Sequence, residues 1–267
     1  MSSTFSAALR IDRNVRVRGA QRSVPVSGGI AIFHDELQVI HYLNAMLLEA
    51  PLNPELGAED LVALAERCHR HVSDRYVVLD DAVAAERLAP GLLRAGWERR
   101  RTLFMDWHGG APVRDLRARE ISEAELRELQ LEVYSEERFP PSAPHGLRAA
   151  LVEGQSALRA GTRSRCFGAG EDGGLQSMAT LFLDEDEQGP IAMVEEVATL
   201  SAFRRRGLGG AAVCAAVDTA LRSGAVRIVI PTDAEDWPQV LYAELGFEPL
   251  GNSVSFTLHG GSKYGGV

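Results

Sequence analysis

The sequence predicts an α/β (α+β) fold, in which helices pack on a mixed β-sheet. Short apolar runs bounded by turn residues alternate along the chain with longer segments that have the apolar spacing of amphipathic helices. In the second half, three strand-like runs follow one another with only tight turns between them, a pattern typical of antiparallel hairpins. Together these features indicate a mixed sheet with helical cover.

Length and composition limit the possible architectures. The chain has 267 residues, enough for one large domain or two modest ones. Its 45% apolar and 24% charged residues are close to globular averages, which excludes disordered, collagen-like and coiled-coil classes. We find no apolar run near the ~18 residues of a membrane span, and no signal-peptide core at the N-terminus. We therefore expect a soluble, cytoplasmic protein.

Net charge and cysteine content limit the kinds of ligand, disulfide and metal site that the chain is expected to have. The net charge of −9 argues against nucleic acid as a partner. Residues 109–267 carry −8 of it, which mildly favours a cationic small molecule, although a solvated acidic surface is the commoner cause. The three cysteines lie far apart, and Cys68-His69-x-His71 falls on a predicted helix without further partners. We expect no disulfide framework and no metal site.

The first half reads as alternating strands and helices. Gly29 to Phe33 is an apolar run of strand length, whereas the class of the following segment, 36–48, cannot be settled from its pattern. Apolar spacing predicts a helix over 59–72. The remaining predicted elements are a strand at 76–79, a helix at 83–93 and a strand at 101–105.

The second half begins after a Gly-Gly and Pro breaker at 107–112. A strand is predicted at 113–117, and Ser122, with Glu125 three positions on, forms a capping box that begins a helix ending near Tyr134. A Pro-rich loop follows at 139–146. The later predicted elements are helices at 145–160, 209–222 and 237–245, and strands at 165–169, 175–183, 191–200, 226–230 and 254–258. We expect the Gly-rich tail to be mobile.

The two halves echo one another. The segments that begin at Arg75 and Val226 share the order strand, acidic loop, helix, Gly-aromatic pair, strand. Within them, the stretch from Leu93 to Glu98 aligns with the stretch from Ala243 to Glu248. The echo indicates a partial internal duplication.

The strongest chemical motif is Arg204-x-x-Gly207-x-Gly209, which joins a strand to a helix rich in Ala and Val. Its glycines let backbone N–H groups turn toward an anion without a Cβ in the way. The helix N-terminus adds about half a positive charge, and Arg204, Arg205 and Arg206 add full ones. The motif therefore predicts a cradle for a pyrophosphate.

This loop resembles the acyl-CoA loop of the GCN5-related N-acetyltransferase (GNAT) superfamily, (Gln/Arg)-x-x-Gly-x-(Gly/Ala). Tyr242-x-x-x-Gly246-Phe247 resembles that superfamily's Tyr-x-x-x-Gly-Phe signature. The order of predicted elements over the second half matches as well, which implies the acyl-CoA N-acyltransferase fold with its splayed β-sheet. A dinucleotide-binding unit fits poorly, because the third spaced glycine is missing and hairpins precede the loop.

The resemblance implies a mode of cofactor binding. In the family, the strand before the loop and the strand after its helix splay apart, and the pantetheine arm of acetyl-CoA lies between them. Here those strands are 191–200 and 226–230. The implied cofactor-binding residues are Val197, Ala198, Thr199, Arg204, Arg205, Arg206, Gly207, Leu208, Gly209 and Gly210.

The resemblance also implies catalytic residues. Tyr242 occupies the position of the acid that protonates the leaving thiolate. Glu195 and Glu196 are candidates for the base, although the family's most familiar base position falls near Met193. Strict alternation along a strand lets only one of the pair face the acceptor, and it places Glu195 on the face of Val197 and Thr199, unless a bulge shifts the phase. The family's usual Asn is replaced by Asp236, which puts a cofactor contact there in doubt.

We therefore predict three regions: a degenerate, partial acetyltransferase-like domain at 1–110, a catalytic GNAT domain at 111–260 and a flexible tail at 261–267. The predicted activity is transfer of an acetyl group from acetyl-CoA to a primary amine of a small molecule, without a metal. The alternative is a non-catalytic CoA-binding or scaffold protein. We expect a monomer or homodimer that binds neither nucleic acid nor membrane, and the sequence does not identify the acceptor.

Overall fold

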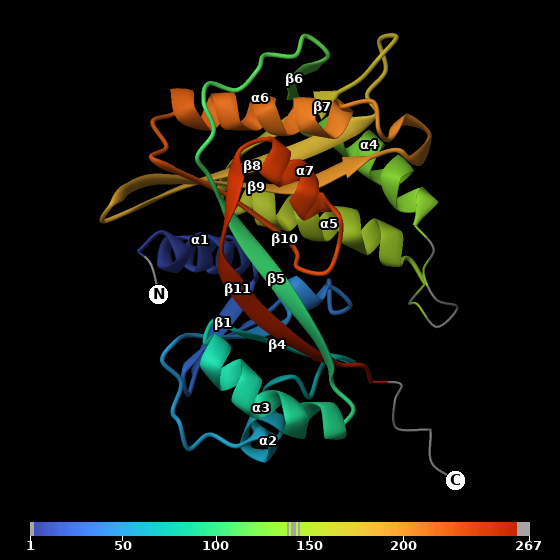
Figure 1. Cartoon of the computed structure of the whole chain (residues 1–267). Helices are drawn as coiled ribbons and strands as arrows, with labels where there is room; N and C mark the ends of the chain where they lie inside the picture. The colour runs from blue at the N-terminus through green and yellow to red at the C-terminus, as the bar shows by residue number, and fades with distance from the viewer. Residues whose placement is uncertain (1–2, 138, 140–142, 144, 261–267) are drawn as a thin grey trace.

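A computed structural model describes residues 3–137, 139, 143 and 145–260 (Figure 1). The predicted tail at 261–267 lies outside the described residues, as does most of the Pro-rich loop. The helical elements are α1 (Ser3–Gly19), η1 (His41–Leu43), α2 (Ala58–Cys68), α3 (Ala82–Arg94), α4 (Glu123–Glu136), α5 (Leu147–Ala160), η2 (Ser201–Phe203), α6 (Leu208–Arg222) and α7 (Pro238–Glu244). The strands are β1 (Arg22–Val26), β2 (Gly29–Phe33), β3 (Ala45–Leu48), β4 (Arg75–Leu79), β5 (Glu98–Trp107), β6 (Ala118–Ile121), β7 (Arg163–Ala169), β8 (Ser177–Asp186), β9 (Gly189–Thr199), β10 (Arg227–Asp233) and β11 (Phe247–Leu258).

All of these strands belong to one mixed sheet, which confirms the predicted fold class. Their order across the sheet is β1-β2-β3-β4-β11-β5-β10-β9-β8-β7-β6. The pairs β3–β4 and β9–β10 are parallel, and the other neighbours are antiparallel. In Figure 1, the first-half strands lie below and the second-half strands above, with β5 and β11 running side by side between them.

The two halves exchange their last strands. β5 ends the first half, yet it pairs with β10, through Thr102–Asp106 against Val229–Asp233. β11 ends the second half, yet it pairs with β4, through Val254–Leu258 against Arg75–Leu79. The repeated order seen in the sequence is therefore matched by two strand–helix–strand units, β4-α3-β5 and β10-α7-β11, whose last strands change places.

The structure corrects one local prediction and adds elements that the sequence analysis did not assign. The predicted strand at 113–117 is wrong: that segment is irregular, β6 begins only at Ala118, and Val113 and Leu116 are 80% and 89% exposed. With no apolar face to bury, the segment gains nothing from joining the sheet. The unsettled segment 36–48 contains η1 and β3. The sequence reading also missed α1 and β1.

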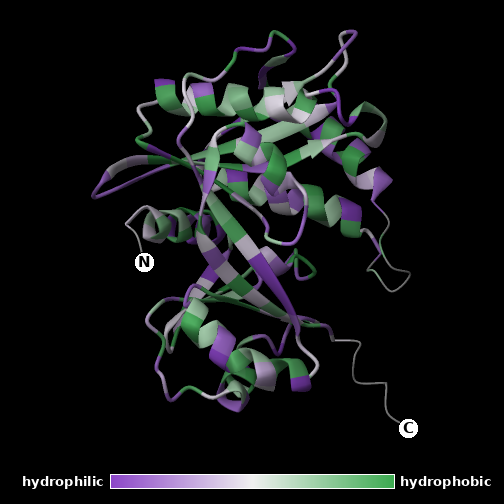
Figure 2. Cartoon of the chain, in the orientation of Figure 1, coloured by the Kyte–Doolittle hydropathy of each residue, from purple (hydrophilic) through white to green (hydrophobic). Residues whose placement is uncertain are grey.

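Helix α1 fills the space between the halves. It contacts α5, β9, β5 and β11, and its buried face includes Phe5, Ile11 and Val15. These side chains share a cluster with Phe104 of β5 and Met193 of β9. On the opposite face of the upper sheet, the small residues of α6 pack on β7, β8 and β9. Figure 2 shows α6 and the strands beneath it as predominantly hydrophobic. Among the described residues, the helices are too short or too polar to cross a bilayer.

Because of the exchange, side chains from β11 complete the core of the first half. Phe256 is fully buried among Val77, Leu79, Leu88 and other residues of that half. Phe256→Ala should lower the free energy of unfolding by about 3–5 kcal/mol, since the lost side chain leaves a cavity. Urea denaturation measures this loss. Leu116→Ala, at an 89% exposed position, is the control and should change it by less than about 0.5 kcal/mol. A similar small loss in both variants would contradict the exchange.

Candidate functional site

The site begins where β9 and β10 separate. The two strands pair only through Ile191–Met193 and Arg227–Val229. Beyond that point β10 continues its pairing with β5, and β9 continues with β8. The predicted splayed sheet is therefore present, and the edge of β9 from Val194 to Thr199 faces an open wedge.

The wedge opens into a cleft of about 890 Å³. Nine of the ten predicted cofactor-binding residues line it, and so does Tyr242. The other walls come from the end of α4, from η2 and from the start of α7. The lining residues are Val133, Glu136, Glu137, Val197, Ala198, Thr199, Ser201, Phe203, Arg204, Arg205, Gly207, Leu208, Gly209, Gly210, Asp236, Trp237, Pro238, Leu241 and Tyr242.

The floor of the cleft at its charged end is the N-terminus of α6. Gly207 is the N-cap residue and has φ = 80°, a left-handed conformation that glycine adopts without strain. The N–H groups of Leu208, Gly209 and Gly210 belong to the first turn and have no intrahelical acceptor. A Cβ on Gly209 would lie 3.3 Å from Thr199 Oγ1, so glycine lets the helix approach β9 closely. These features suit an anion at this position.

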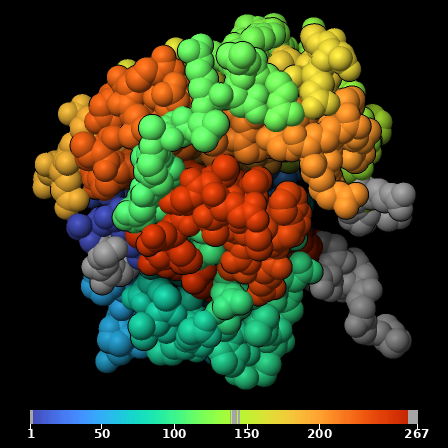
Figure 3. Space-filling view, turned by 45° about the horizontal axis from the view of Figure 1, so that its top comes forward, coloured from blue at the N-terminus to red at the C-terminus, as the bar shows by residue number. Residues whose placement is uncertain are grey.

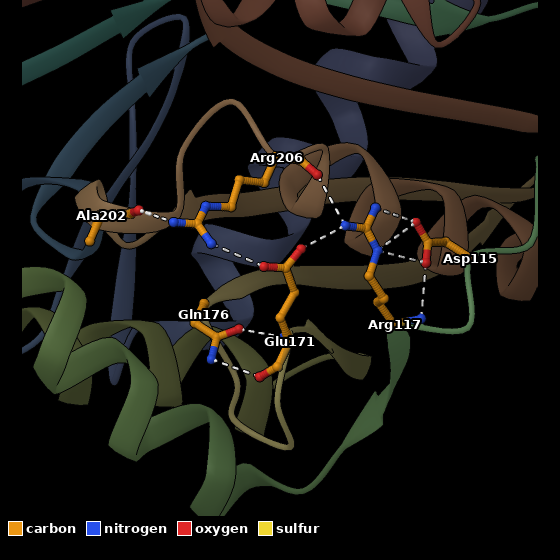
Figure 4. Close-up of polar contacts among 6 residues, drawn as sticks. All are labelled: Asp115, Arg117, Glu171, Gln176, Ala202 and Arg206. Atoms are coloured by element: carbon orange, nitrogen blue, oxygen red, sulfur yellow. Dashed lines mark hydrogen bonds and ion pairs between the residues drawn. The ribbon is translucent and has the colours of Figure 1, made fainter.

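Arg206 is the predicted cofactor residue that does not line the cleft. Its guanidinium lies 3.2 Å from Glu171 Oε2 and donates to the Ala202 carbonyl, so its side chain is engaged within the loop (Figure 4). Glu171 also accepts from Arg117, which in turn donates to the Arg206 carbonyl. The amide of Gln176 pairs with the backbone of Glu171 and fixes the loop between β7 and β8.

We name Asp115, Arg117, Glu171 and Arg206 the loop brace. Arg117 lies 2.8 Å from Asp115 Oδ2 and comes from the connection between the halves. Figure 3 shows this connection, in green, running over the face formed by α6 and α7. Through the Arg206–Glu171 ion pair and the hydrogen bond from Arg117 to the Arg206 carbonyl, the loop brace holds the arginine-rich loop in position. Sequence reasoning missed Arg117 and Glu171, because no local pattern links positions so far apart in the chain.

Tyr242 lies on the short helix α7 and is 5% exposed. Its ring packs edge-on against Phe247, at 6.2 Å between centroids. Burial raises its pKa, and the negative charge of Glu195 raises it further. The phenol therefore stays protonated at neutral pH and is able to donate a proton in the cleft.

A bulge in β9 decides where the two adjacent glutamates point. Glu195 lies opposite Thr180, but Ala198 lies opposite Met178, so β9 has one residue more than β8 in this stretch. Glu196 takes up the extra residue with φ = 55°. The bulge that the sequence analysis left open is therefore present and breaks the strict alternation, and the contacts of Glu196 with Thr180 and Arg159 place its carboxylate on the side of α5.

Glu196 is a buried anchor. Its carboxylate accepts from Tyr134 (3.2 Å), Thr180 (3.1 Å) and Gln130, and it lies 3.1 Å from the Arg159 guanidinium. These partners come from α4, α5 and β8. With every lone-pair direction engaged, Glu196 fixes the helices that flank the wedge rather than offering a free base.

Glu195 has a different environment. Helix α1 brings Asp12 and Arg16 near it, and these two are ion-paired at 3.0 Å. Burial, together with the charges of Asp12 and Glu196, raises the pKa of Glu195 to about 7, while Arg16 opposes the rise. A carboxyl group with a pKa near neutrality is suited to accept a proton at physiological pH. Glu196 is thus committed to contacts with α4, α5 and β8, whereas Glu195 has the buried, charged surroundings of a candidate base; neither is among the residues that line the described cleft.

Asp236 lines the cleft at the start of α7. Its Oδ1 accepts from the Trp237 N–H at 2.7 Å, so the carboxylate shapes the start of the helix. The sequence puts a cofactor contact by Asp236 in doubt, and the structure does not test this contact, so that statement stays a prediction.

Comparisons with known proteins agree with this geometry. The family described as "Acetyltransferase (GNAT) family" matches residues 124–247, which include the loop, α6, β10 and α7. This stretch of the chain, a little under half of it, is therefore similar to a GNAT acetyltransferase domain. Among curated proteins, none matches the sequence significantly.

Solved structures extend the likeness to the whole chain. A GCN5-related N-acetyltransferase from Kribbella flavida is 20% identical, with a TM-score of 0.59 over 96% of each chain. A conserved protein of unknown function from Staphylococcus epidermidis is 11% identical, with a TM-score of 0.67 over 90% of this chain and 94% of that one. A tandem GNAT protein from the clavulanic acid biosynthesis pathway is 16% identical, with a TM-score of 0.53 over 82% and 77%. At these identities the likeness is one of fold.

The anchor generates a stability prediction. The side chains of Arg159 and Glu196 are 2% and 4% exposed, so Arg159→Met leaves a buried charge without its partner. The free energy of unfolding should fall by about 3–5 kcal/mol, measured by urea denaturation. Arg165→Met breaks an ion pair to Glu120 that is nearly half exposed on both sides and should cost about 0–1 kcal/mol. Equal losses in the two variants would show that the buried pair does not anchor the wedge.

Proposed function

We propose that the chain is an N-acetyltransferase that moves an acetyl group from acetyl-CoA to a primary amine of a small molecule by direct attack. The observation that carries the proposal is the wedge between β9 and β10, which ends at the arginine-flanked N-terminus of α6. A neutral, open strand edge followed by a cationic cradle matches the two chemical parts of CoA: an amide-bearing arm and a pyrophosphate.

In this proposal, the pantetheine amides pair with the backbone of Val197, Ala198 and Thr199. The pyrophosphate lies on the N–H groups of Leu208 to Gly210, next to Arg204 and Arg205, which both line the cleft. Arg206 contributes indirectly, because its side chain belongs to the loop brace and only its backbone remains for the phosphate. The positive charge of the loop is thus divided between binding and positioning.

The chemical step is one addition followed by one elimination. Glu195 takes a proton from the acceptor ammonium, and the amine nitrogen then attacks the thioester carbonyl, forming the C–N bond. A backbone N–H on the open edge of β9 stabilises the oxyanion. The tetrahedral intermediate collapses with cleavage of the C–S bond, and Tyr242 donates its proton to the leaving thiolate. The nitrogen loses its second proton as it becomes an amide, and this proton restores the Tyr242 phenol, while the proton on Glu195 passes to solvent. No metal enters this scheme.

The alternative, a non-catalytic CoA-binding or scaffold protein, rests on Asp236 and on the missing base at Met193. The raised pKa of Glu195 favours the catalytic proposal, because carboxyl groups held near neutrality are more common in catalytic sites than in binding sites. Release of CoA thiol in the presence of a panel of primary amines distinguishes the two. We further propose that the enzyme is cytoplasmic and acts as a monomer or homodimer.

The first prediction from this proposal concerns cofactor binding. Calorimetric titration of the protein with acetyl-CoA should show a Kd in the micromolar range, and Gly207→Asp should abolish it. The substitution places a carboxylate at the helix N-terminus and a side chain at φ = 80°. Gly224→Asp is the matched control, since Gly224 has φ = 83° with open space around it at the far end of α6. No binding by the wild type, or equal loss in both variants, would refute the proposed cofactor site.

The second prediction concerns the base. Only the deprotonated carboxylate accepts a proton, so kcat at saturating substrates should rise as the pH increases through about 7. Glu195→Gln should lower kcat by about 10²-fold or more and remove this inflection. Thiol release with the best acceptor of the amine panel measures it. Glu187→Gln, on an exposed turn, is the control and should leave the profile unchanged. An unaltered inflection in Glu195→Gln would exclude Glu195 as the base.

A further inference from the structure

Two histidines and an aspartate meet far from the cleft. His41 Nε2 lies 2.6 Å from Asp74 Oδ2, and His259 Nδ1 lies 2.9 Å from the same oxygen. Each of the three residues offers one potential ligand atom, and these ligand atoms all lie within 4.8 Å of one another. The residues come from η1, from the turn before β4 and from the end of β11, so only the folded chain brings them together.

Neighbouring groups hold the three side chains in orientation. The Gly260 N–H donates to Asp74 Oδ1 at 3.0 Å, which leaves Oδ2 directed at the two imidazoles. The ring of His41 stacks on Tyr76, with centroids 5.7 Å apart. On the far side of His259, Nε2 lies 3.8 Å from Glu98 Oε2. At 3.8 Å Glu98 does not hydrogen-bond this imidazole, but a modest movement of its side chain would give the carboxylate–histidine contact that orients metal-binding imidazoles.

We propose that His41, Asp74 and His259 form a binding site for a divalent transition-metal ion, of which Zn²⁺ fits best. Two imidazole nitrogens and one carboxylate oxygen suit Zn²⁺ better than Ca²⁺ or Mg²⁺, which prefer oxygen ligands. Ligands about 2.0–2.1 Å from a tetrahedral Zn²⁺ are about 3.3 Å apart. The present separations of 2.6 and 2.9 Å therefore need to widen by less than about 1 Å, and the ligand atoms of the two imidazoles, which lie within 4.8 Å of one another, need to take up a similar spacing.

When the ion binds, it replaces the two hydrogen bonds that His41 Nε2 and His259 Nδ1 now make with Asp74 Oδ2. Each neutral imidazole keeps one proton, on Nδ1 of His41 and on Nε2 of His259, and the latter proton points toward Glu98. The side chains of His41, Asp74 and His259 are 33%, 21% and 50% exposed, so water reaches the fourth coordination position.

The position of the site suggests a structural role. Leu258, the last residue of β11, pairs with Arg75, which directly follows Asp74. A bound ion would link the end of the exchanged strand to η1 and to the start of β4. Metal binding should therefore stabilise the fold, because the ligands are together only in the native state.

Calorimetric titration of the tag-free, chelator-treated full chain with ZnCl₂ tests the proposal. We expect one equivalent bound with a micromolar or lower Kd, and a higher Tm in the presence of Zn²⁺. His259→Ala and His41→Ala should each weaken binding at least about tenfold and remove the rise in Tm, and Glu98→Gln should weaken it less. His108→Ala is the matched control, because His108 pairs with Asp106 at 3.1 Å without a second histidine in that pair.

A second measurement needs no variant. The visible absorption of the wild-type protein titrated with Co²⁺ should show the bands of a low-coordinate, histidine-bound ion at one equivalent. Absence of stoichiometric Zn²⁺ binding, octahedral Co²⁺ bands only, or an unchanged Kd in His259→Ala would overturn the proposal and leave the three residues as a hydrogen-bonded latch.

Discussion

The loss of pairing between two parallel strands governs this structure. β9 and β10 share a register only through Met193, and everything in the candidate site follows from their divergence. Backbone groups that a continuous sheet would satisfy become available to a ligand along β9. Glu196, the bulge residue, fixes the diverging strand in place. Its carboxylate accepts a hydrogen bond from Tyr134 of α4 and pairs with Arg159 of α5. The separation of β9 from β10 opens the wedge, and the contacts of Glu196 hold its walls in position.

The sequence predicts most of the proposed cofactor-binding residues, because they belong to a motif of residues that are close together in the chain. Arg204-x-x-Gly207-x-Gly209 fixes a turn and a helix start within a few residues, and nine of the ten predicted residues line the cleft. The exception, Arg206, is drawn away by Glu171, a residue 35 positions earlier. No periodicity or propensity encodes such a distant ion pair, and the same holds for the trio of His41, Asp74 and His259.

The catalytic side is predicted less well, for two physical reasons. Alternation along a strand assumes an unbroken register, and the left-handed residue at Glu196 breaks it. The environment of Glu195 depends on α1, whose Asp12 and Arg16 come from the opposite end of the chain. The helix escaped notice because its four arginines mask an apolar stripe of Phe5, Ile11 and Val15. The strand order was also out of reach, since the apolar patterns of β5 and β11 do not say which neighbour each one takes.

The exchange of β5 and β11 has a consequence for the history and integrity of the molecule. Two separate subunits that traded their terminal strands would make a domain-swapped dimer, stable only above the concentration at which they associate. Here residues 108–117 join the two halves within one chain. The effective concentration of one half near the other is therefore set by this short connection and does not depend on the concentration of the protein. The arrangement amounts to an obligate dimer folded within one chain. Each half depends on a strand of the other to complete its part of the sheet.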